Sequence, residues 1–377
     1  MVYNLFVPLV PSYVAALEPY VTGRSVAEVC ERYGLKHAIK LASNENPLGA
    51  SPKAVRAVLQ LLESQPNRLA VYPTGGSVLS EVLAAHFGVH RRNVITGSGS
   101  EGIMSNIVRT FLCDGDEVLT ADVTFFGFRV LAQSRGVAYR TVPLRNWRFD
   151  LEAIADAVNQ RTKIIYLANP NNPTGDIFTR AEFDAFYRRI PERVLIILDE
   201  AYCEYARGNP QYPDSLTYRY DNVITLRTFS KAYGLAGMRI GYGFAHEDLI
   251  SNLAKIKLPF EPSALAETAG VAALEDSEFL ADTLRNNARG MEQLVRELDL
   301  LGVRYVRSHA NFVMTLWPAA DVAAEITEGL LRQGLIVRPL APFGVPNGIR
   351  ITIGTPEDNA LLTAALSRVM KECLVCS

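Results

Sequence analysis

The chain has little of what marks a secreted, membrane-spanning or nucleic-acid-binding protein. Its 377 residues include only five cysteines, and this odd, scattered set favours reduced thiols in the cytoplasm over a disulfide framework. No apolar run reaches the roughly 18 residues that a membrane-spanning helix needs. The net charge is −2 and like charges do not cluster, so the chain lacks the basic field that attracts nucleic acid or anionic membranes.

The two ends of the chain carry only weak signals. Residues 1–14 are fairly apolar but contain no basic segment, so we expect an N-terminal arm and not a signal peptide. Cys373 and Cys376 form a C-x-x-C, but one such pair in a tail is weak evidence for a metal or redox site. We therefore predict no metal centre.

Between residues 91 and 245, short apolar strands alternate with amphipathic helices. The run from Val194 to Leu198 is apolar on both faces, which is typical of a mostly parallel sheet covered by helices on both sides. This pattern predicts an α/β fold, with a large domain built on a mostly parallel seven-stranded sheet flanked by helices. The expected strands span residues 94–96, 117–120, 137–143, 164–168, 194–199, 223–226 and 239–243.

The pattern changes after Pro262. A long helical stretch, broken near Asp276, is followed by short strands and two further helices. This order is typical of a smaller α+β domain. We predict that residues 36–261 form the large domain, and that residues 1–35 and 262–377 form an N-terminal arm and a small C-terminal domain.

The segment from Gly97 to Gly102 matches G-x-G-x-x-G between a predicted strand and a predicted helix, and Asp122 follows 20 residues later. On spacing alone this is a dinucleotide-binding fingerprint, which indicates a nicotinamide-dependent dehydrogenase. A wider interpretation is that small residues let backbone N–H groups at a helix start approach any phosphate. A tight turn that binds no ligand is the third interpretation.

Polar residues collect where the predicted strands end. The turn 169–175 follows one strand, Asp199 closes the next, and Lys231 comes shortly after a third. Because the carboxyl ends of parallel strands meet at one edge of a sheet, we expect these residues to lie close together. Each alone also fits a turn, a helix cap or a solvated side chain. Together they supply the parts of a pyridoxal-phosphate site.

Pyridoxal phosphate needs an amine to hold it, a carboxylate for its ring nitrogen and donors for its ring hydroxyl. Lys231 can supply the amine when a neighbouring cation such as Arg239 lowers its pKa. Asp199 can keep the pyridine nitrogen protonated, and Asn172 and Tyr202 can hydrogen-bond the ring hydroxyl. We therefore predict Lys231, Asp199 and Tyr202 as catalytic residues.

The phosphate and the ring face of the cofactor need further partners. Phe125, which follows the strand at 117–120, can stack on the ring. Backbone N–H groups at the start of a helix, small hydroxyl side chains and a cation can surround the phosphate. The residues expected there are Ser100, Glu101, Gly102, Thr228, Ser230 and Arg239.

These segments resemble the class I and II aminotransferases of the aspartate-aminotransferase fold, and among them the histidinol-phosphate aminotransferases. The resemblance covers nearly the whole chain and implies fold type I with pyridoxal 5'-phosphate as the cofactor. The lysine segment and the Asn-Glu-Asn-Pro run are together highly specific. The matching segments are 41–49, 171–175, 199–202, 228–239 and 348–354.

The resemblance also implies roles that spacing cannot show. Arg350 would bind the carboxylate of an amino-acid substrate, while Arg338 and Tyr20 would contact the substrate at its phosphate. Asn46 would lie near the substrate entrance. Tyr72 would reach the cofactor phosphate of the other subunit, which implies a homodimer with shared active sites.

The implied reaction is the transamination of L-histidinol phosphate with 2-oxoglutarate, which gives imidazole acetol phosphate and L-glutamate in histidine biosynthesis. Two departures leave an aromatic amino-acid aminotransferase open. Glu101 and Gly102 stand where the family carries Asp-Glu, and Phe125 lacks the hydroxyl of the family's tyrosine. In that alternative, Phe125 and Phe128 would line an apolar pocket for phenylalanine or tyrosine. A decarboxylase of the same fold and the nicotinamide dehydrogenase are more distant alternatives.

Overall fold

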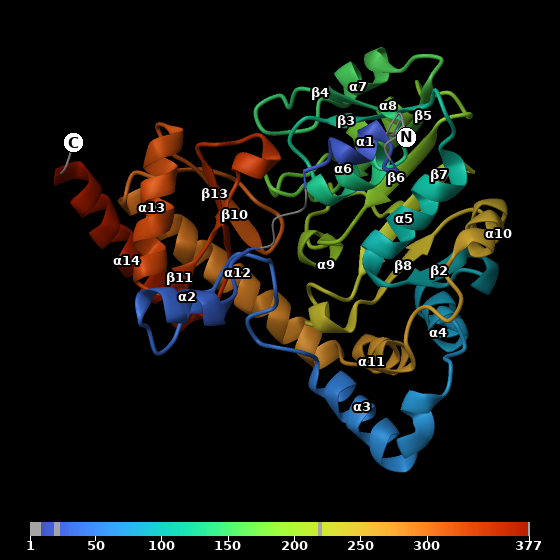
Figure 1. Cartoon of the computed structure of the whole chain (residues 1–377), viewed down its shortest axis with the longest axis horizontal. Coiled ribbons are helices and arrows are strands. Elements are labelled where there is room, and N and C mark those ends of the chain that lie inside the picture. The colour runs from blue at the N-terminus through green and yellow to red at the C-terminus, as the bar shows by residue number, and fades with distance from the viewer. Residues whose placement is uncertain (1–8, 19–22, 218–220, 376–377) are drawn as a thin grey trace, which may run out of the picture.

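The computed structural model describes residues 9–18, 23–217 and 221–375, and its strands form two main sheets of unequal size (Figure 1). The larger sheet has the strand order β2-β8-β7-β6-β5-β3-β4. Strand β8 is antiparallel to both neighbours and the other pairs are parallel, which confirms the predicted sheet. Its strands are β2 (Val94–Gly97), β3 (Glu117–Ala121), β4 (Ala138–Val142), β5 (Thr162–Ala168), β6 (Leu195–Asp199), β7 (Val223–Thr228) and β8 (Gly241–Phe244).

Helices cover both faces of this sheet, and this explains why its strands are apolar throughout. In β6, Ile197 packs in one cluster with α5, α6 and α10, whereas the adjacent Ile196 packs in another with α7 and α8. A third cluster joins α3, α4 and α11 to the β2–β8 side of the sheet. These helices are α3 (Pro52–Ser64), α4 (Ser77–Phe87), α5 (Gly99–Phe111), α6 (Phe126–Gln133), α7 (Leu151–Ala157), α8 (Arg180–Tyr187), α10 (Glu247–Ile256) and α11 (Ala264–Leu274).

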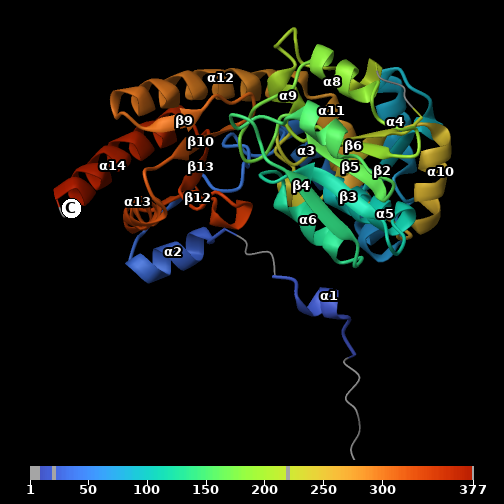
Figure 2. The same ribbon diagram turned by 90° about the horizontal axis from the view of Figure 1, so that it is seen from above.

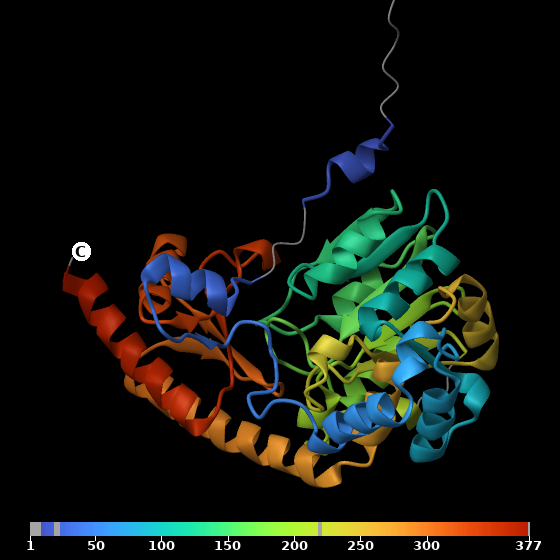
Figure 3. The ribbon, with the colours of Figure 1, turned by 60° about the horizontal axis from the view of Figure 1, so that its bottom comes forward.

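The smaller region is an antiparallel sheet of order β12-β13-β10-β9 with helices packed on it. Helix α2 lies against this region because Val29 packs on Leu331 and Ile336 (Figure 3). This is the predicted α+β arrangement. Its elements are α2 (Val26–Tyr33), β9 (Arg304–Val306), β10 (Phe312–Leu316), α13 (Ala320–Arg332), β12 (Arg338–Pro339), β13 (Gly348–Thr352), α14 (Pro356–Val375) and the parallel pair β1 (Ile39–Lys40) and β11 (Leu335–Ile336).

One long helix, α12 (Ser277–Leu300), runs from beside the larger region into the smaller one (Figures 1 and 2). At 1.5 Å per residue its 24 residues span about 36 Å. Asp276 is its N-cap, at the predicted break in the helical stretch.

Helix α11 lies beyond the expected boundary at residue 262 but packs into the core of the larger sheet, and β1 pairs with the smaller region. The division of the chain at residues 36 and 262 stays a prediction.

The described residues also form two short helices, α1 (Ser12–Ala15) and α9 (Cys203–Ala206). Across the described ranges, none of the helices combines the length and the apolar character that crossing a bilayer requires. Two predicted residues, Tyr20 and Cys376, lie outside the described residues.

Candidate active site

A cavity lies where the carboxyl ends of β5, β6 and β7 face strands β12 and β13 of the smaller sheet. The larger sheet contributes polar side chains from its strand ends, and the smaller sheet contributes two arginines. The structure therefore brings most of the predicted site residues together. Those that line the cavity are Ser100, Glu101, Phe125, Asn172, Asp199, Tyr202, Thr228, Ser230, Lys231, Arg239, Arg338 and Arg350.

Lys231 lies in this cavity three residues after the end of β7. Its Nζ donates a hydrogen bond of 3.1 Å to the carbonyl oxygen of Ser43. Burial lowers the pKa of Lys231 to about 8, and the nearby Arg350 lowers it further than Arg239 does, while Glu45 raises it. Arg239, the cation expected from the sequence, thus lowers the pKa of Lys231 as predicted, and Arg350 is a second cation that the sequence did not indicate. The amine can thus lose its proton near neutral pH.

The loop that carries Lys231 rests closely on the segment around residue 49. Gly234 has φ +68°, and a Cβ atom there would lie 1.9 Å from the carbonyl oxygen of Gly49. Asn46 supports the same loop, since its side-chain amide donates to the carbonyl of Ala232 at 3.0 Å and to Thr283 Oγ1 at 2.9 Å. Asn46 is not among the residues that line the cavity. Its predicted contact with substrate stays a prediction.

Asp199 ends β6 and is almost fully buried. Its Oδ2 accepts a hydrogen bond of 2.6 Å from the hydroxyl of Tyr166, and its Oδ1 accepts one of 3.2 Å from the backbone N–H of Ala201. Burial raises the pKa of Asp199 to about 6, although these two hydrogen bonds oppose the rise. The carboxyl group is therefore ionised at neutral pH. Sequence reasoning missed Tyr166, whose only signal is a tyrosine within an aliphatic strand.

Tyr202 is held by a residue far away in the sequence. The side-chain amide of Asn44 donates to the Tyr202 hydroxyl oxygen at 2.8 Å, and the Asn44 backbone N–H donates to Thr352 Oγ1 at 3.0 Å. The Asn44 amide thereby fixes the position of the Tyr202 hydroxyl oxygen. Asn44 was not predicted as a site residue, although it lies in the matched segment 41–49.

Asn172 and Arg350 are joined across the two regions. Arg350 Nη1 donates to the side-chain oxygen of Asn172, and its Nη2 donates to the carbonyl oxygen of Ala42 at 2.8 Å. These contacts hold the guanidinium group of β13 beside the strand ends of the larger sheet. Arg350 and Arg338 are direct register partners on β13 and β12, and both are buried.

A concave set of donors surrounds the start of α5. Gly99 has φ +75°, and a Cβ atom there would lie 2.9 Å from Arg239 Nη2, so the absence of a side chain leaves room for the guanidinium. Ser230 Oγ lies 3.0 Å from Thr228 Oγ1 and 3.5 Å from Arg239 Nη1. A helix start, two hydroxyl groups and a cation together fit a phosphate. Gly102 lies within α5 and is not among the residues that line the cavity.

The two phenylalanines of the aromatic segment lie in different places. Phe125 lines the cavity and is the N-cap of α6, with its ring packed over Gly127. Phe128 is fully buried in the core and its ring stacks on Tyr166 at 4.3 Å. The expectation that Phe128 could line an apolar substrate pocket is wrong, because its ring faces the sheet and not the cavity.

Tyr72 is not among the residues that line the cavity of its own chain. Its side chain is exposed and stacks on Phe260 with ring centroids 4.2 Å apart. Other exposed apolar side chains occur in the same part of the sequence and around residues 256–260. They are Val55, Leu59, Leu69, Val71, Val78, Ile256, Leu258 and Phe260.

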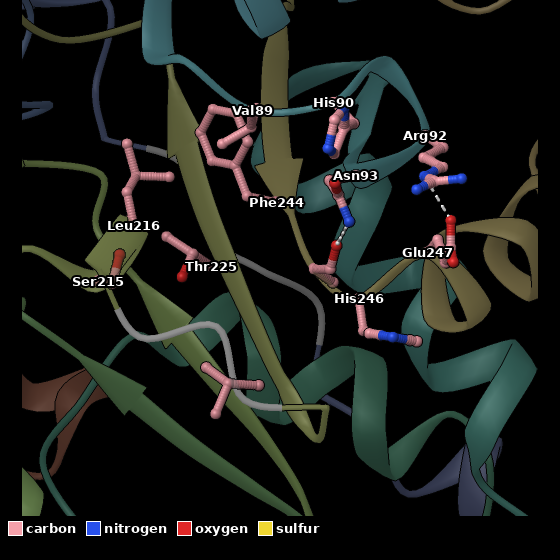
Figure 4. Close-up of a pocket in the computed structure, with 12 residues that line it drawn as sticks. Val89, His90, Arg92, Asn93, Ser215, Leu216, Thr225, Phe244, His246 and Glu247 are labelled. Carbon is pink, nitrogen blue, oxygen red and sulfur yellow. Dashed lines mark hydrogen bonds and ion pairs between the residues drawn. The ribbon is translucent and has the colours of Figure 1, made fainter.

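A second pocket lies at the opposite end of the large sheet, where β7 begins and β8 ends (Figure 4). It contains His90 and His246 and an ion pair between Arg92 and Glu247. None of the predicted site residues within the described part of the chain lines it. The strand ends, and not this pocket, carry the convergent polar groups expected of an active site.

Comparisons with known proteins agree with this geometry. Residues 36–366 match the family described as aminotransferase class I and II. A histidinol-phosphate aminotransferase of Pseudomonas fluorescens is 42% identical over 373 residues, which cover 97% of this chain and 98% of that protein. One from a Geobacillus species is 40% identical over 366 residues, covering 96% of this chain and 98% of the other.

Solved structures show the same likeness. The histidinol-phosphate aminotransferase of Sinorhizobium meliloti in complex with pyridoxal-5'-phosphate has a TM-score of 0.88 at 30% identity, and the match covers 97% of this chain and 98% of that one. The aspartate aminotransferase of Thermus thermophilus with maleate has a TM-score of 0.83 at 22% identity over 96% of this chain and 99% of that one, which shows the shared fold. The dehydrogenase interpretation of the glycine segment is therefore wrong, and the chain belongs to the class I and II aminotransferases.

Proposed function

We propose that the chain transaminates L-histidinol phosphate with 2-oxoglutarate, giving imidazole acetol phosphate and L-glutamate. The observation that carries this proposal is the 40–42% identity to histidinol-phosphate aminotransferases over nearly the full length of both chains. The cavity supports it, because two buried arginines on adjacent strands suit a substrate with a dianionic phosphate.

The residues present fit pyridoxal phosphate. Lys231 would hold it through the amine, Asp199 would hold the proton of the ring nitrogen, and Asn172 and Tyr202 would donate to the ring hydroxyl. When bound, the cofactor withdraws electrons from the substrate carbon that bears the amine. The phosphate would occupy the donors at the start of α5, with Phe125 against the ring face.

Lys231 would also move the proton on which the reaction depends. Its Nζ is held by the carbonyl of Ser43, and its lowered pKa leaves much of the amine neutral near pH 8. A neutral amine at this position can take the proton from the substrate carbon that bears the nitrogen and return it as general acid. Asp199, ionised and shielded from water, supplies the fixed charge that makes this carbon acidic.

Arg350 would bind the anionic group common to both substrates. Its planar guanidinium group suits either a phosphate or a carboxylate, so 2-oxoglutarate can use the same contact after histidinol phosphate has left. Arg338 would add a second donor that favours the dianion. Tyr20, which lies outside the described residues, stays a predicted third contact.

A homodimer is part of the proposal. The exposed Tyr72 does not line the cavity of its own chain, so we expect its hydroxyl to act in the cavity of a second copy of the chain. Two-fold symmetry is the commonest closed arrangement in which each subunit completes the site of the other. We also propose a cytoplasmic location, supported by the free thiols of Cys30, Cys113 and Cys203.

The experiment that tests the function compares catalytic efficiency for histidinol phosphate, phenylalanine and tyrosine, each with 2-oxoglutarate as acceptor. We expect histidinol phosphate to exceed both aromatic amino acids by at least roughly tenfold, the discrimination that about 1.4 kcal/mol supplies. Borohydride treatment should fix the cofactor on the peptide that contains Lys231. If phenylalanine or tyrosine is preferred, the chain is an aromatic amino-acid aminotransferase and the proposed substrate is wrong.

A further inference from the structure

We infer that Tyr166 is a positioning residue that holds the carboxylate of Asp199 in place for the cofactor's ring nitrogen. The inference rests on the role proposed for Asp199. It concerns a residue that does not line the cavity and is not part of any matched motif quoted above.

The two residues lie on adjacent parallel strands of the large sheet. Tyr166 pairs with Ile197, and Ala168 pairs with Asp199. The side chains of Tyr166 and Asp199 therefore project from the same face of the sheet, on neighbouring strands and offset along them. The Tyr166 hydroxyl donates to Oδ2 of Asp199 at 2.6 Å, and the backbone N–H of Ala201 donates to Oδ1. Each carboxylate oxygen is thus held by its own donor, which fixes the rotation of the group.

Tyr166 is itself immobilised. The residue is fully buried, and its ring stacks on Phe128 with an interplanar angle of 13°. Thr120 Oγ1 donates to the Tyr166 carbonyl oxygen at 2.6 Å and holds the backbone. Phe128 lies in the first turn of α6, three residues after its N-cap Phe125. The start of this helix therefore links the Phe125 ring that lines the cavity to the Phe128 ring that supports Tyr166.

The hydrogen bond also affects the charge of Asp199. Burial and Glu200 raise the pKa of Asp199, whereas the Tyr166 hydroxyl and Lys231 lower it. Burial and Asp199 raise the pKa of Tyr166 well above its usual value, with smaller contributions from Tyr139 and Tyr202, so its hydroxyl remains a donor. When the Tyr166 hydroxyl is removed, one of the groups that counteract the effect of burial and Glu200 on the pKa of Asp199 is lost. The pKa of Asp199 then rises, and its carboxylate holds the ring proton less firmly.

The test replaces Tyr166 by phenylalanine, which keeps the ring and its stacking, in the cofactor-loaded enzyme. A ring nitrogen that loses its proton withdraws fewer electrons from the nitrogen that joins the cofactor to Lys231, so that nitrogen becomes more basic. We expect the pH midpoint of the visible absorbance change to rise by about one unit, since a hydrogen bond to a charged group is worth roughly a tenfold change or more. The affinity for cofactor should fall by roughly tenfold, and kcat should fall more than KM rises.

Tyr242 provides the matched control. It is a fully buried tyrosine on β8 of the same sheet, and its hydroxyl has no hydrogen-bond partner among the described residues. Tyr242→Phe should therefore leave the midpoint and the cofactor affinity unchanged. Phe128→Leu, which keeps the Tyr166 hydroxyl but removes the stacked ring, should shift the midpoint in the same direction by a smaller amount. If Tyr166→Phe does not fold, Phe128→Leu still tests the inference.

The variant Asp199→Asn distinguishes a failure of this inference from a failure of the role proposed for Asp199. That variant should raise the midpoint more than Tyr166→Phe does, and adding Tyr166→Phe to it should change the midpoint little further. If Asp199→Asn shifts the midpoint but Tyr166→Phe behaves like Tyr242→Phe, the inference is overturned and the proposed site stands. An unchanged midpoint in Asp199→Asn would overturn the role of Asp199 and this inference with it. The pH midpoint and the affinity for cofactor do not depend on the identity of the amino donor.

Discussion

Arg338 and Arg350 are direct partners across strands β12 and β13, and both line the cavity that contains Lys231. Each guanidinium carbon lies 5.9 Å from the centroid of the Phe343 ring. Like charges placed opposite one another on a sheet repel, and a dianionic phosphate between them would relieve that repulsion. This arrangement supports the proposal that the substrate carries a phosphate and not only a single carboxylate.

The substrate proposal predicts an asymmetric effect of Arg338→Ala. Loss of a charged hydrogen bond of about 1.5–3 kcal/mol should lower catalytic efficiency for histidinol phosphate by roughly ten- to hundredfold. Efficiency for phenylalanine should change by only a few-fold, because its single carboxylate would use Arg350. Steady-state kinetics with both donors, at a fixed 2-oxoglutarate concentration, measures this. Equal losses for the two donors would show that Arg338 supports the cavity without selecting the phosphate.

The pKa of Lys231 predicts how cofactor capture depends on pH. Only the neutral amine reacts, so the rate at which cofactor-free protein takes up pyridoxal phosphate should rise with pH and level off above about 8. Arg350→Met removes a cation that lowers this pKa, so the midpoint should move to higher pH. Glu45→Gln removes a carboxylate that raises it, so the midpoint should move to lower pH. Stopped-flow absorbance at a fixed cofactor concentration measures the uptake rate, and hence its pH midpoint, in both variants. If the two midpoints shift in the same direction, the electrostatic explanation of the Lys231 pKa is contradicted.

The proposed dimer predicts complementation between two impaired variants. Lys231→Ala lacks the amine, and Tyr72→Ala lacks the residue expected to reach the neighbouring site. In a hybrid dimer one of the two sites has both residues intact, so random mixing should restore about a quarter of the unmodified activity. The measurement is activity after co-refolding, compared with the sum of the two variants assayed separately. A monomeric but active protein on a sizing column would contradict the shared site.

The contact between Gly234 and Gly49 predicts that Gly234→Ala disrupts the lysine loop. A side chain at Gly234 is disfavoured for two reasons. The backbone angle φ is +68°, and an added Cβ would lie 1.9 Å from the carbonyl oxygen of Gly49. Gly302 is a matched control, with φ +68° and nothing within 4 Å of its added Cβ. Gly302→Ala should cost about 1 kcal/mol of stability from the backbone conformation alone. Gly234→Ala should cost more and should also weaken cofactor binding, measured by thermal unfolding and equilibrium dialysis.

The amino-acid sequence by itself determined the sheet and the ends of its strands. Apolar runs such as β6 can be buried only between layers of helices, so the order of strands and helices predicts a parallel sheet without any tertiary information. The carboxyl ends of parallel strands meet at one edge, and Asp199 and Lys231 could therefore be placed together from their positions after β6 and β7.

Only the tertiary structure decided the contacts between side chains that no local pattern links. The hydrogen bond from Asn44 to Tyr202 joins residues 158 positions apart. Arg350, from the smaller sheet, lowers the pKa of Lys231 more than Arg239 does, although Arg239 is much nearer in the sequence. Phe128 could face either the cavity or the core, and packing on Tyr166 placed it in the core. Periodicity reports which residues are buried but not which partner they meet, because that depends on how elements distant in the sequence pack together.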